Sequence, residues 1–359
     1  MTQSRSFVVA RDDLARTRTL EQVLPPLEDG ELRLKVDRFA FTANNVTYGE
    51  TGDSIGYWKF YPAPEGWGHI PVWGFADVVE SRCEGLAPGE RIYGFLPMAT
   101  HLTLRPQRLG AASFVDATEH RQALPAAYNL YLRTAGDPAY RREDEDLQAL
   151  LRPMFITSFL IDDFLADEGF FGATRVVLSS ASAKTAIGLA YLLHRRGGVE
   201  VVGLTSAGNR GFVADLGCYD RVLTYDQLAT LPADPVTVYV DFAGSAALRL
   251  QVHEHLGERL VYSSAVGLSH RDTERAKSPV PGVKPIFFFA PDRLRKRAKD
   301  WGREGIEPRV TEQWRGFVSD ARTWLSVQRG TGVDAVQAAY AQALAGQVPP
   351  NIGLVLALD

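Results

Sequence analysis

The first 110 or so residues alternate apolar and polar positions in short runs that turns interrupt. The segment GELRLKVDRFAFT alternates from Glu31 onward, and IPVWGFADVVES and GERIYGFLP follow it between glycine and proline residues. Alternation with a period of two, bounded by such residues, is typical of half-buried strands. This block is therefore predicted to form an antiparallel β module.

The segment from Ala111 to about Arg152 has a different pattern, because it is polar and mixes acidic with basic residues. Its central stretch reads AYNLYLRTAGDPAYRREDEDLQALL. We expect a helical insertion over about 117–152 that forms a solvated flap. If this stretch is helical, Tyr128 and Tyr131 share one face of the helix, because residues three apart are neighbours there.

From Pro153 onward, buried apolar runs alternate with helical patterns. The predicted strands are VVLSS, VEVVGLTS, TVYVDFAG, ERLVYSSAVG and KPIFFFAP, with helices around Asn209–Leu216 and Ser245–Leu256 between them. Apolar strands separated by helices indicate a parallel sheet that is covered on both faces. From Asp292 the chain returns to long charged helices and ends in the strand-like NIGLVLALD. The fold class is thus α/β.

The composition mainly excludes classes of partner and location. At 359 residues the chain is long enough for two domains or one large α/β unit. Its formal charge of -4 and the lack of a basic run argue against nucleic acid as a partner. No apolar stretch of about 18 residues occurs, and the N-terminal segment has no signal-peptide core. We therefore expect a cytoplasmic protein with no membrane partner.

The stretch Val176–Leu193, VVLSSASAKTAIGLAYLL, predicts a buried strand, a turn of small residues and a helix. A dinucleotide-binding βαβ unit begins in this way, although the usual glycines are missing here. Small side chains still leave the N–H groups at the helix N-terminus accessible to an anion. Two registers stay open, with Ala183 or Thr185 in place of the last glycine. Both place Ser179 to Thr185 around a pyrophosphate, and the expected contacts are Ser180, Ala181, Ser182, Ala183, Lys184 and Thr185.

The end of the next strand indicates which dinucleotide binds. A site for NAD carries Asp or Glu there to accept a hydrogen bond from the ribose 2′-OH. This chain has instead Thr205, Ser206, Asn209 and Arg210. Hydroxyls and a guanidinium suit a 2′-phosphate, which a carboxylate would repel. The expected cofactor is therefore NADPH. Two alternatives stay open: Arg210 solvates the start of a helix, or the domain no longer holds a dinucleotide.

The order of these segments resembles that of the medium-chain dehydrogenase/reductase superfamily over nearly the whole chain. NNVTYGETG and IPVWGFADVVES resemble its N-terminal domain, and VDFAG, ERLVYSSAVG and AYAQALAGQVPPNIGLVLAL follow in the family's order. YWKFYPAPEGWG, MATHLTL and SSASAKTA also resemble a subfamily labelled as a domain of unknown function. The resemblance implies a GroES-like antiparallel β domain and a Rossmann domain with a doubly wound parallel sheet.

The resemblance also implies domain boundaries and further site residues. A GroES-like substrate domain would cover 1–152, the nucleotide-binding domain 153–290, and a C-terminal segment, 291–359, would return to the substrate domain. The active site would lie in the cleft between the domains. The matching downstream segments add these expected cofactor contacts: Phe242, Ala243, Gly244, Ser263 and Ser264.

Two departures from the family pattern bear on the reaction. Phe75 follows Gly74 where the zinc alcohol dehydrogenases carry a ligand histidine, and no cysteine lies near Asn44. The chain's two cysteines, Cys83 and Cys218, also cannot form the family's four-cysteine lobe. Without zinc no Lewis acid activates an alcohol, so the resemblance favours the zinc-independent quinone and enoyl reductase branch. Its substrates are conjugated carbonyl compounds.

We expect Tyr48 to donate the proton and Asn44 and Asn45 to hold the substrate carbonyl as neutral donors. Tyr57, Tyr128 and Tyr131 are the alternative proton donors. Aromatic residues around this segment either line an apolar pocket or form the core of the β module: Phe39, Phe41, Tyr57, Trp58, Phe60 and Tyr61.

The sequence thus favours a zinc-free NADPH-dependent reductase of enones, enoyl compounds or quinones. The alternatives are a non-catalytic or regulatory dinucleotide-binding protein and a redox-neutral enzyme of the same fold, such as an isomerase. A homodimer is expected through Lys284–Pro291. Its consecutive apolar residues would be an aggregation hazard at an exposed sheet edge, and the resembled family pairs this strand across a dyad.

Overall fold

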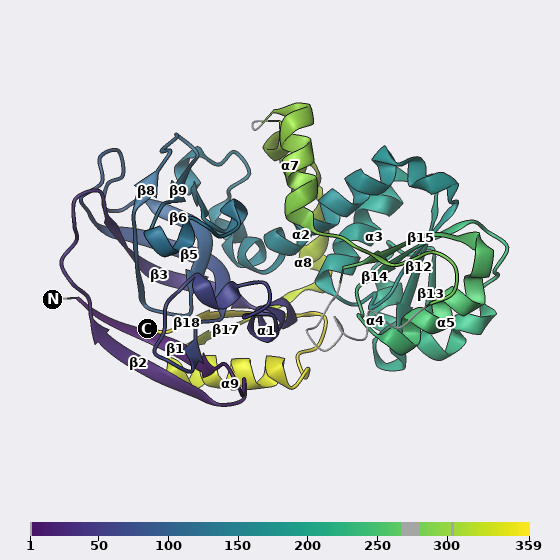
Figure 1. Cartoon of the computed structure of the whole chain (residues 1–359), viewed down its shortest axis with the longest axis horizontal. Coiled ribbons are helices and arrows are strands. Elements are labelled where there is room, and N and C mark those ends of the chain that lie inside the picture. The colour runs from purple at the N-terminus through teal and green to yellow at the C-terminus, as the bar shows by residue number, and fades with distance from the viewer. Residues whose placement is uncertain (1, 267–279, 303–304) are drawn as a thin grey trace. The chain divides into compact units, whose positions relative to one another are not determined.

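The computed structural model describes residues 2–266, 280–302 and 305–359 (Figure 1). Its contacts divide the chain into two compact units. Unit 1 comprises Met1–Leu150 and Leu325–Asp359, and unit 2 comprises Leu151–Trp324. The chain returns to unit 1 at Leu325, which is later than residue 291, where the resemblance places the return. The two helices before Leu325 belong to unit 2.

Unit 1 consists of two sheets that are largely antiparallel, as the alternating pattern predicts. The smaller sheet has the order β2-β1-β4 and the larger one β17-β18-β3-β5-β6-β10-β9-β8, with β7 paired to β3. The strands are β1 (Gln3–Ala10), β2 (Thr17–Val23), β3 (Leu32–Phe41), β4 (Trp67–Gly68), β5 (Pro71–Ser81), β6 (Arg91–Pro97), β7 (His101–Leu104), β8 (Pro106–Gln107), β9 (Ser113–Asp116), β10 (Leu130–Arg133), β17 (Ser326–Thr331) and β18 (Ile352–Ala357). The α-helices are α1 (Ala43–Glu50) and α9 (Val333–Leu344), and α9 packs along β17 and β18 (Figure 1).

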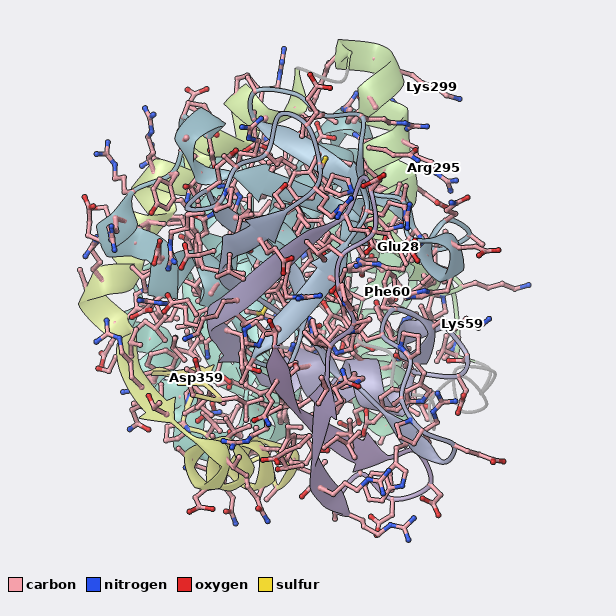
Figure 2. The ribbon with its side chains drawn as sticks, turned by 90° about the vertical axis from the view of Figure 1, so that its left-hand side faces the viewer. Glu28, Lys59, Phe60, Arg295, Lys299 and Asp359 are labelled. Carbon is pink, nitrogen blue, oxygen red and sulfur yellow. The ribbon has the colours of Figure 1, made fainter. Side chains whose placement is uncertain are left out.

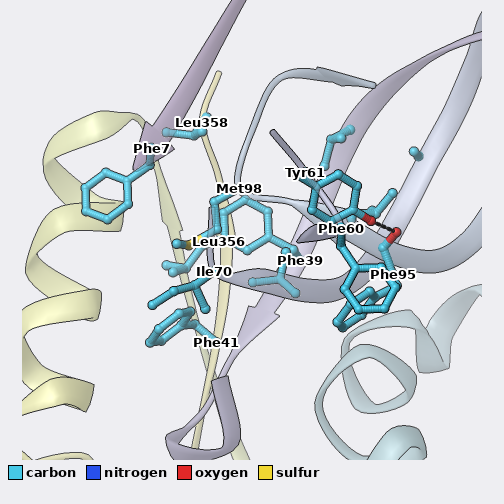
Figure 3. Packing of buried hydrophobic residues seen from close by; sticks show 14 of the residues in the cluster. Phe7, Phe39, Phe41, Phe60, Tyr61, Ile70, Phe95, Met98, Leu356 and Leu358 are labelled. Atoms are coloured by element: carbon cyan, nitrogen blue, oxygen red, sulfur yellow. Dashed lines mark hydrogen bonds between the residues drawn. The ribbon is translucent and has the colours of Figure 1, made fainter. Parts of the chain in front are cut away.

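The core of unit 1 is rich in aromatic side chains that come from distant segments (Figure 3). Phe39 and Phe41 on β3 are 0% and 1% exposed, and Phe60 and Tyr61 are 1% and 5% exposed. Tyr57 and Trp58 belong to the same cluster. Of the two interpretations of these aromatic residues, the core of the β module is therefore confirmed.

The predicted helical insertion over 117–152 is wrong for most of its length. Residues 117–144 form short 3₁₀ turns and the strand β10, and the α-helix begins at Glu145. The reason is tertiary, because β10 pairs with both β6 and β9 and so completes the larger sheet. Locally, Pro125 and Pro138 also disfavour a continuous helix, since proline lacks the N–H group and clashes with the preceding turn.

A buried cation anchors this segment. Arg121 is 1% exposed and donates to the Asn129 side chain at 3.0 Å and to the Tyr131 hydroxyl at 2.8 Å. It also forms an ion pair with Asp116 at 3.1 Å. Tyr131 therefore points into the core from β10, and it shares no helix face with Tyr128.

Unit 2 contains a parallel sheet with helices on both faces, as predicted. The strand order is β13-β12-β11-β14-β15-β16. The strands are β11 (Arg175–Leu178), β12 (Glu200–Thr205), β13 (Arg221–Thr224), β14 (Thr237–Asp241), β15 (Leu260–Ala265) and β16 (Ile286–Phe287). The α-helices of the described segments are α2 (Glu145–Asp167, which begins in unit 1), α3 (Lys184–Arg196), α4 (Arg210–Asp215), α5 (Ala246–Leu256), α7 (Ala290–Trp301) and α8 (Ile306–Trp324).

Alternate side chains of β11 pack on opposite faces of this sheet. Val176 and Leu178 pack in one hydrophobic cluster with residues of α2, α3 and α4, and Val177 packs in another with residues of α5. Successive side chains of a strand point to opposite faces. An entirely apolar strand is therefore what a sheet covered on both sides requires.

Ion pairs attach α7 to α2 within unit 2. Arg293 and Arg297 are 6% and 8% exposed, and both contact Asp163 at 2.7 Å. Arg295 and Lys299 of the same helix are exposed instead, and Figure 2 shows them at the outer surface. Of the five Lys and Arg residues of α7, three thus contact carboxylates of α2: Arg293, Lys296 and Arg297.

Strand β16 lies at the edge of the parallel sheet and pairs with β15. Its two residues, Ile286 and Phe287, are 53% and 48% exposed. Phe288, which follows, packs against the core of unit 2. An apolar edge strand with open backbone groups is suited to pair with another chain.

The helices of the described segments include none that combines the length and the apolar character needed to cross a membrane.

Candidate functional site

The order of the strands in unit 2 places a crevice between β11 and β14. From β11 the chain continues outward through β12 and β13, and it then returns to β14 and continues through β15 and β16 on the other side. In open α/β sheets, ligands bind at such a reversal, outside the carboxyl ends of the strands. The residues that follow β11, β12, β14 and β15 are therefore the candidate cofactor site.

Ser179, directly after β11, holds the two sides of this crevice together. Its Oγ donates to the carboxylate of Asp241 at 2.8 Å and accepts from the backbone N–H groups of Phe242 and Ala243 at 2.9 and 3.0 Å. Asp241 also accepts from the N–H of Gly244 at 3.1 Å. The backbone N–H groups of the expected cofactor contacts at 242–244 are thus bonded within the protein.

The Asp241 carboxylate is neutralised by a buried guanidinium on α5. Arg249 donates from Nε to Asp241 Oδ2 at 2.9 Å, and its Nη2 lies 2.8 Å from the same oxygen. Asp241 and Arg249 are 1% and 2% exposed. The charges therefore compensate each other at the base of the crevice.

The loop between β11 and α3 is held close to β12. Ala181 is fully buried, and its N–H donates to the carbonyl of Leu204 at 3.0 Å. A Cβ atom added to Gly203 would lie 2.9 Å from the Cβ of Ala181, so this approach requires glycine on β12. Ser180 adopts a left-handed backbone conformation with φ of 48°, which glycine tolerates more readily than serine. Ala181 thus anchors the loop, and its side chain packs inward.

The N-terminus of α3 has the features of an anion site. Ala183 precedes the helix, and no side chain of the described residues caps it. The first N–H groups of a helix lack partners within the helix, and they carry its positive dipole end. Lys184 and Thr185 lie in this first turn and are partly buried. Burial lowers the pKa of Lys184 to about 8.

The end of β12 meets this loop, as the sequence predicts. The Asn209 amide donates to Ser182 Oγ at 3.0 Å. Thr205 is 1% exposed, and its Oγ1 has no hydrogen-bond partner among the described residues. Ser206 and Arg210 are exposed. Within the described segments, Arg210 has no ion pair, and no carboxylate follows β12 as far as residue 214.

Ser263 and Ser264 at the end of β15 differ in what they contact. The Ser263 hydroxyl lies 3.0 Å from Nε2 of His253, so it is used within the protein. Ser264 Oγ is buried and lacks a partner in the described part of the chain. Of the two expected contacts, Ser264 is therefore the one with an unused polar atom.

In unit 1, the predicted proton donor Tyr48 lies on α1 and is 6% exposed. Its ring lies 4.4 Å from that of Tyr57 and 5.7 Å from that of Phe95, measured between centroids. Burial raises the pKa of Tyr48 far above its usual value, and Tyr128 raises it further. Asn44 and Trp73 oppose this rise in pKa, because each stabilises the ionised form of the oxygen. The hydroxyl is therefore protonated at neutral pH.

Asn44 and Asn45 have different surroundings. Asn45 is 4% exposed, and its Oδ1 accepts from the Thr42 backbone N–H at 2.8 Å. Its Nδ2 donates to the carbonyl of Pro71 at 2.9 Å. Asn45 thus closes a capping box on α1, and this geometry gives it a structural role in place of the expected oxyanion contact. Asn44 is partly exposed and lies beside Tyr48.

The alternative proton donors have partners of their own. The Tyr57 and Tyr128 hydroxyls share a hydrogen bond of 2.9 Å. The Tyr131 hydroxyl donates to the carbonyl of Phe95 at 2.7 Å and accepts from Arg121. The hydroxyls of all three alternative donors thus contact other groups of the protein, and Tyr48 as the proton donor stays a prediction.

The sequence pattern missed two residues near these sites and the contacts of a third. Ser179 was expected around the pyrophosphate, whereas its hydrogen bonds to the β14 turn depend on strand order. Tyr225 follows β13, and its hydroxyl interacts with Ser180. Trp73 on β5 brings its indole beside Tyr48. In the sequence, Trp73 is notable only as an aromatic residue beside Gly74. That feature by itself predicts a position in the core.

The described segments contain no group of three or more His, Cys, Asp or Glu side chains that could hold a metal ion. Cys83 lies in unit 1 and Cys218 in unit 2, and both are free thiols.

A groove of about 670 Å³ in unit 1 is lined by residues of β3, β5, β17 and β18. Its charged side chains are paired: Lys35 contacts Asp359 at 2.8 Å, and Asp77 contacts Arg91 at 2.9 Å. Arg329 pairs with Asp146. Since these charges satisfy one another, the groove gives no reason to expect a charged ligand.

A family model described as "Protein of unknown function (DUF2855)" matches residues 39–349. The comparison with curated proteins gives no match. Among solved structures, CurA from Vibrio vulnificus in complex with NADPH is similar over 99% of both chains, with 12% identity and a TM-score of 0.66.

Two further structures are similar over the full length. The quinone oxidoreductase from Coxiella burnetii covers 100% of both chains, with 13% identity and a TM-score of 0.58. A mutant form of enoyl thioester reductase from Candida tropicalis covers 99% of this chain and 100% of its own, with 10% identity and a TM-score of 0.61. At these identities the likeness shows the fold. The prediction of a GroES-like antiparallel β domain with a Rossmann domain is confirmed.

Proposed function

The chain belongs to the family described as "Protein of unknown function (DUF2855)". From the geometry of unit 2 we propose that it is a zinc-independent reductase. Its cofactor is NADPH and its substrate is a conjugated carbonyl compound of the enone, enoyl or quinone type. The observation that carries the proposal is the end of β12, where an unpaired guanidinium and an unused hydroxyl stand in place of a carboxylate.

The residues present in the crevice fit a phosphorylated dinucleotide. The N-terminus of α3 offers backbone N–H groups to the pyrophosphate, and Ser182 and Thr185 add hydroxyls beside them. Arg210, with Thr205 and Ser206, would hold the 2′-phosphate. Ser264 offers a further unused hydroxyl. When bound, NADPH supplies a hydride for the β-carbon of the acceptor.

The structures similar to this chain support the proposed chemistry. CurA from Vibrio vulnificus was crystallised with NADPH, and the other two are described as a quinone oxidoreductase and an enoyl thioester reductase. In unit 1, the protonated Tyr48 hydroxyl and the partly exposed Asn44 can donate to an oxygen that gains negative charge. Zinc independence remains our prediction and rests on Phe75 in place of a ligand.

Calorimetry on the wild-type protein should show that NADPH binds at least about tenfold more tightly than NADH, which corresponds to about 1.4 kcal/mol. Replacing Arg210 by alanine should remove most of this preference and leave the affinity for NADH unchanged. Arg221→Ala is the matched control, because Arg221 lies at the start of β13 and pairs with Glu200. Equal binding of both cofactors by the wild type would refute the assignment.

Turnover distinguishes the reductase from a regulatory dinucleotide-binding protein. We expect NADPH oxidation with at least one member of a panel of enones and quinones, with the label of 4-deuterated cofactor recovered in the product. Tight NADPH binding without label transfer to any acceptor would favour the regulatory function.

The proposal extends to a homodimer that forms through Lys284–Pro291. The exposed Ile286 and Phe287 on the edge strand β16 support it, because a second copy can complete the open backbone pairing. Light scattering at micromolar concentration should give twice the mass of one chain, and Phe287→Asp should give a monomer. Val23→Asp is the control, because Val23 is 56% exposed on β2 of unit 1. A monomeric wild type would contradict the dimer.

A further inference from the structure

One buried polar group of unit 1 has no function in the proposal above. The indole nitrogen of Trp73 on β5 is inaccessible to solvent and has no hydrogen-bond partner among the described residues. The ring itself is partly exposed. A buried tryptophan N–H usually finds a partner, and leaving one unpaired costs about 1 to 3 kcal/mol. Phenylalanine would fill a similar space without this cost.

The surroundings of Trp73 are aromatic. Its ring lies 5.1 Å from Phe95, 5.8 Å from Tyr93 and 6.2 Å from Tyr128, measured between centroids. Phe95 offers no acceptor, and the hydroxyls of the two tyrosines bond elsewhere: that of Tyr93 donates to the Gln148 carbonyl at 3.4 Å, and that of Tyr128 is paired with Tyr57 at 2.9 Å. The packing explains the position of the ring but not the presence of its nitrogen.

Tyr48 packs against two of the same rings as Trp73. Its ring lies 5.7 Å from Phe95 and 6.4 Å from Tyr128, measured between centroids, and Trp73 also lowers the pKa of the Tyr48 hydroxyl by stabilising its ionised form. Tyr48 is buried, whereas Trp73, Tyr128 and Asn44 around it are partly exposed. The two donors thus lie in one part of the aromatic cluster, beside side chains that are partly exposed.

Two adjacent donors in an aromatic, largely desolvated setting suit one oxygen atom that carries or develops negative charge. The carbonyl oxygen of a conjugated acceptor has this property, since it gains charge when the β-carbon receives a hydride. We propose that the Trp73 indole N–H and the Tyr48 hydroxyl together bind the carbonyl oxygen of the acceptor. This inference rests on the proposed function and adds Trp73 to it as a substrate-contacting residue.

The proposal explains why an unpaired donor is retained. In the ligand-free protein the indole N–H lacks a partner, and the carbonyl oxygen supplies one on binding. A site built to donate a hydrogen bond rejects a ligand without the acceptor, because its own buried group then stays unpaired. Trp73 therefore selects a carbonyl compound over an alkene of the same shape.

The first test is the variant Trp73→Phe in the full-length protein, with Trp67→Phe as the matched control. Trp67 on β4 lies in the same unit and packs against the Arg18 guanidinium at 4.1 Å, away from the aromatic cluster. We expect kcat/KM for 2-cyclohexenone to fall about tenfold to hundredfold in Trp73→Phe and to be unchanged in Trp67→Phe. The melting temperature of Trp73→Phe should be no lower than that of the control, because no hydrogen bond within the protein is lost.

The second test measures ligand binding at Trp73 by NMR and does not depend on turnover. Tryptophan is labelled with ¹⁵N in the indole, and the Trp73 signal is identified by its absence from Trp73→Phe. Adding cyclohexanone, a saturated ketone, should move this signal downfield, whereas the Trp67 signal should stay in place. Cyclohexane should move neither signal.

The outcomes separate this inference from the proposed function. If the wild type reduces enones but Trp73→Phe keeps its kcat/KM and the Trp73 signal does not respond to cyclohexanone, the Trp73 assignment is overturned and the reductase stands. If no acceptor is reduced but the ketone moves the Trp73 signal, the carbonyl site stands and the reductase function fails. If turnover is absent and the signal is unmoved, both are overturned.

Discussion

Replacing Tyr48 by phenylalanine is expected to lower kcat for enone reduction about 100-fold, with a smaller effect on KM. When a hydride adds to the β-carbon, the electron pair of the double bond moves to the carbonyl oxygen. The enolate so formed takes the proton of the Tyr48 hydroxyl, and solvent then replaces that proton. Because burial raises the pKa of Tyr48, the hydroxyl stays protonated across the neutral range. Steady-state kinetics with 2-cyclohexenone measures the change.

Tyr131→Phe is the control for this prediction. Tyr131 is fully buried, and its hydroxyl contacts the Phe95 carbonyl and Arg121, so its loss should lower stability and leave kcat unchanged. The wild-type profile of kcat against pH should show no ionisation of a tyrosine below about pH 10, since the shift of Tyr48 is upward. Rapid reduction by Tyr48→Phe would keep the reaction and remove Tyr48 as the acid.

Replacing Arg249 by methionine is expected to lower the free energy of unfolding of unit 2 by about 3 to 5 kcal/mol. The variant leaves the Asp241 carboxylate buried without its cation, while Asp241 and Arg249 are 1% and 2% exposed in the wild type. NADPH affinity should fall as well, because Asp241 fixes Ser179 and the turn after β14 at the crevice. Urea unfolding followed by circular dichroism and calorimetry with NADPH measure the two effects.

Two further variants check the physical cause. Arg221→Met removes an exposed partner of Glu200 and should change the free energy of unfolding by no more than about 1 kcal/mol. The double variant Asp241→Asn with Arg249→Met should recover part of the lost stability, because it removes the uncompensated charge. If Arg249→Met unfolds as readily as the exposed control and no more so, the buried pair has no special role.

The order of strands and helices was largely predictable from the sequence. Val176, Val177 and Leu178 are all apolar because both faces of β11 are covered, and that pattern needs no knowledge of the partners. The alternation from Glu31 also predicted the strand β3, although Arg33 and Ala40 are buried along with the apolar residues of the other face. The residues after β12 were also placed correctly at the carboxyl edge, where Asn209 reaches Ser182.

The failures have a common cause in contacts between distant segments. The polar composition of 117–144 predicts a solvated segment, but Arg121 is buried against Tyr131 and Asp116. The burial of such a cation cannot be predicted before the positions of its partners are known. Asn45 was expected to hold substrate, whereas its amide reaches the Pro71 carbonyl, 26 positions away. Dimerisation and the role of each site residue remain predictions.

The sequence by itself determined the class of fold and the edge of the sheet at which a cofactor could bind, because periodicity, small turn residues and the absence of a carboxylate are local properties. Only the tertiary structure decided which polar atoms at that edge are used within the protein and which are left for a ligand. Ser179, Ser263 and Asn45 have lost their donors or acceptors to residues that are far away in the chain. The indole of Trp73 has kept its donor, because Phe95 offers no acceptor and the hydroxyls of Tyr93 and Tyr128 bond to other groups.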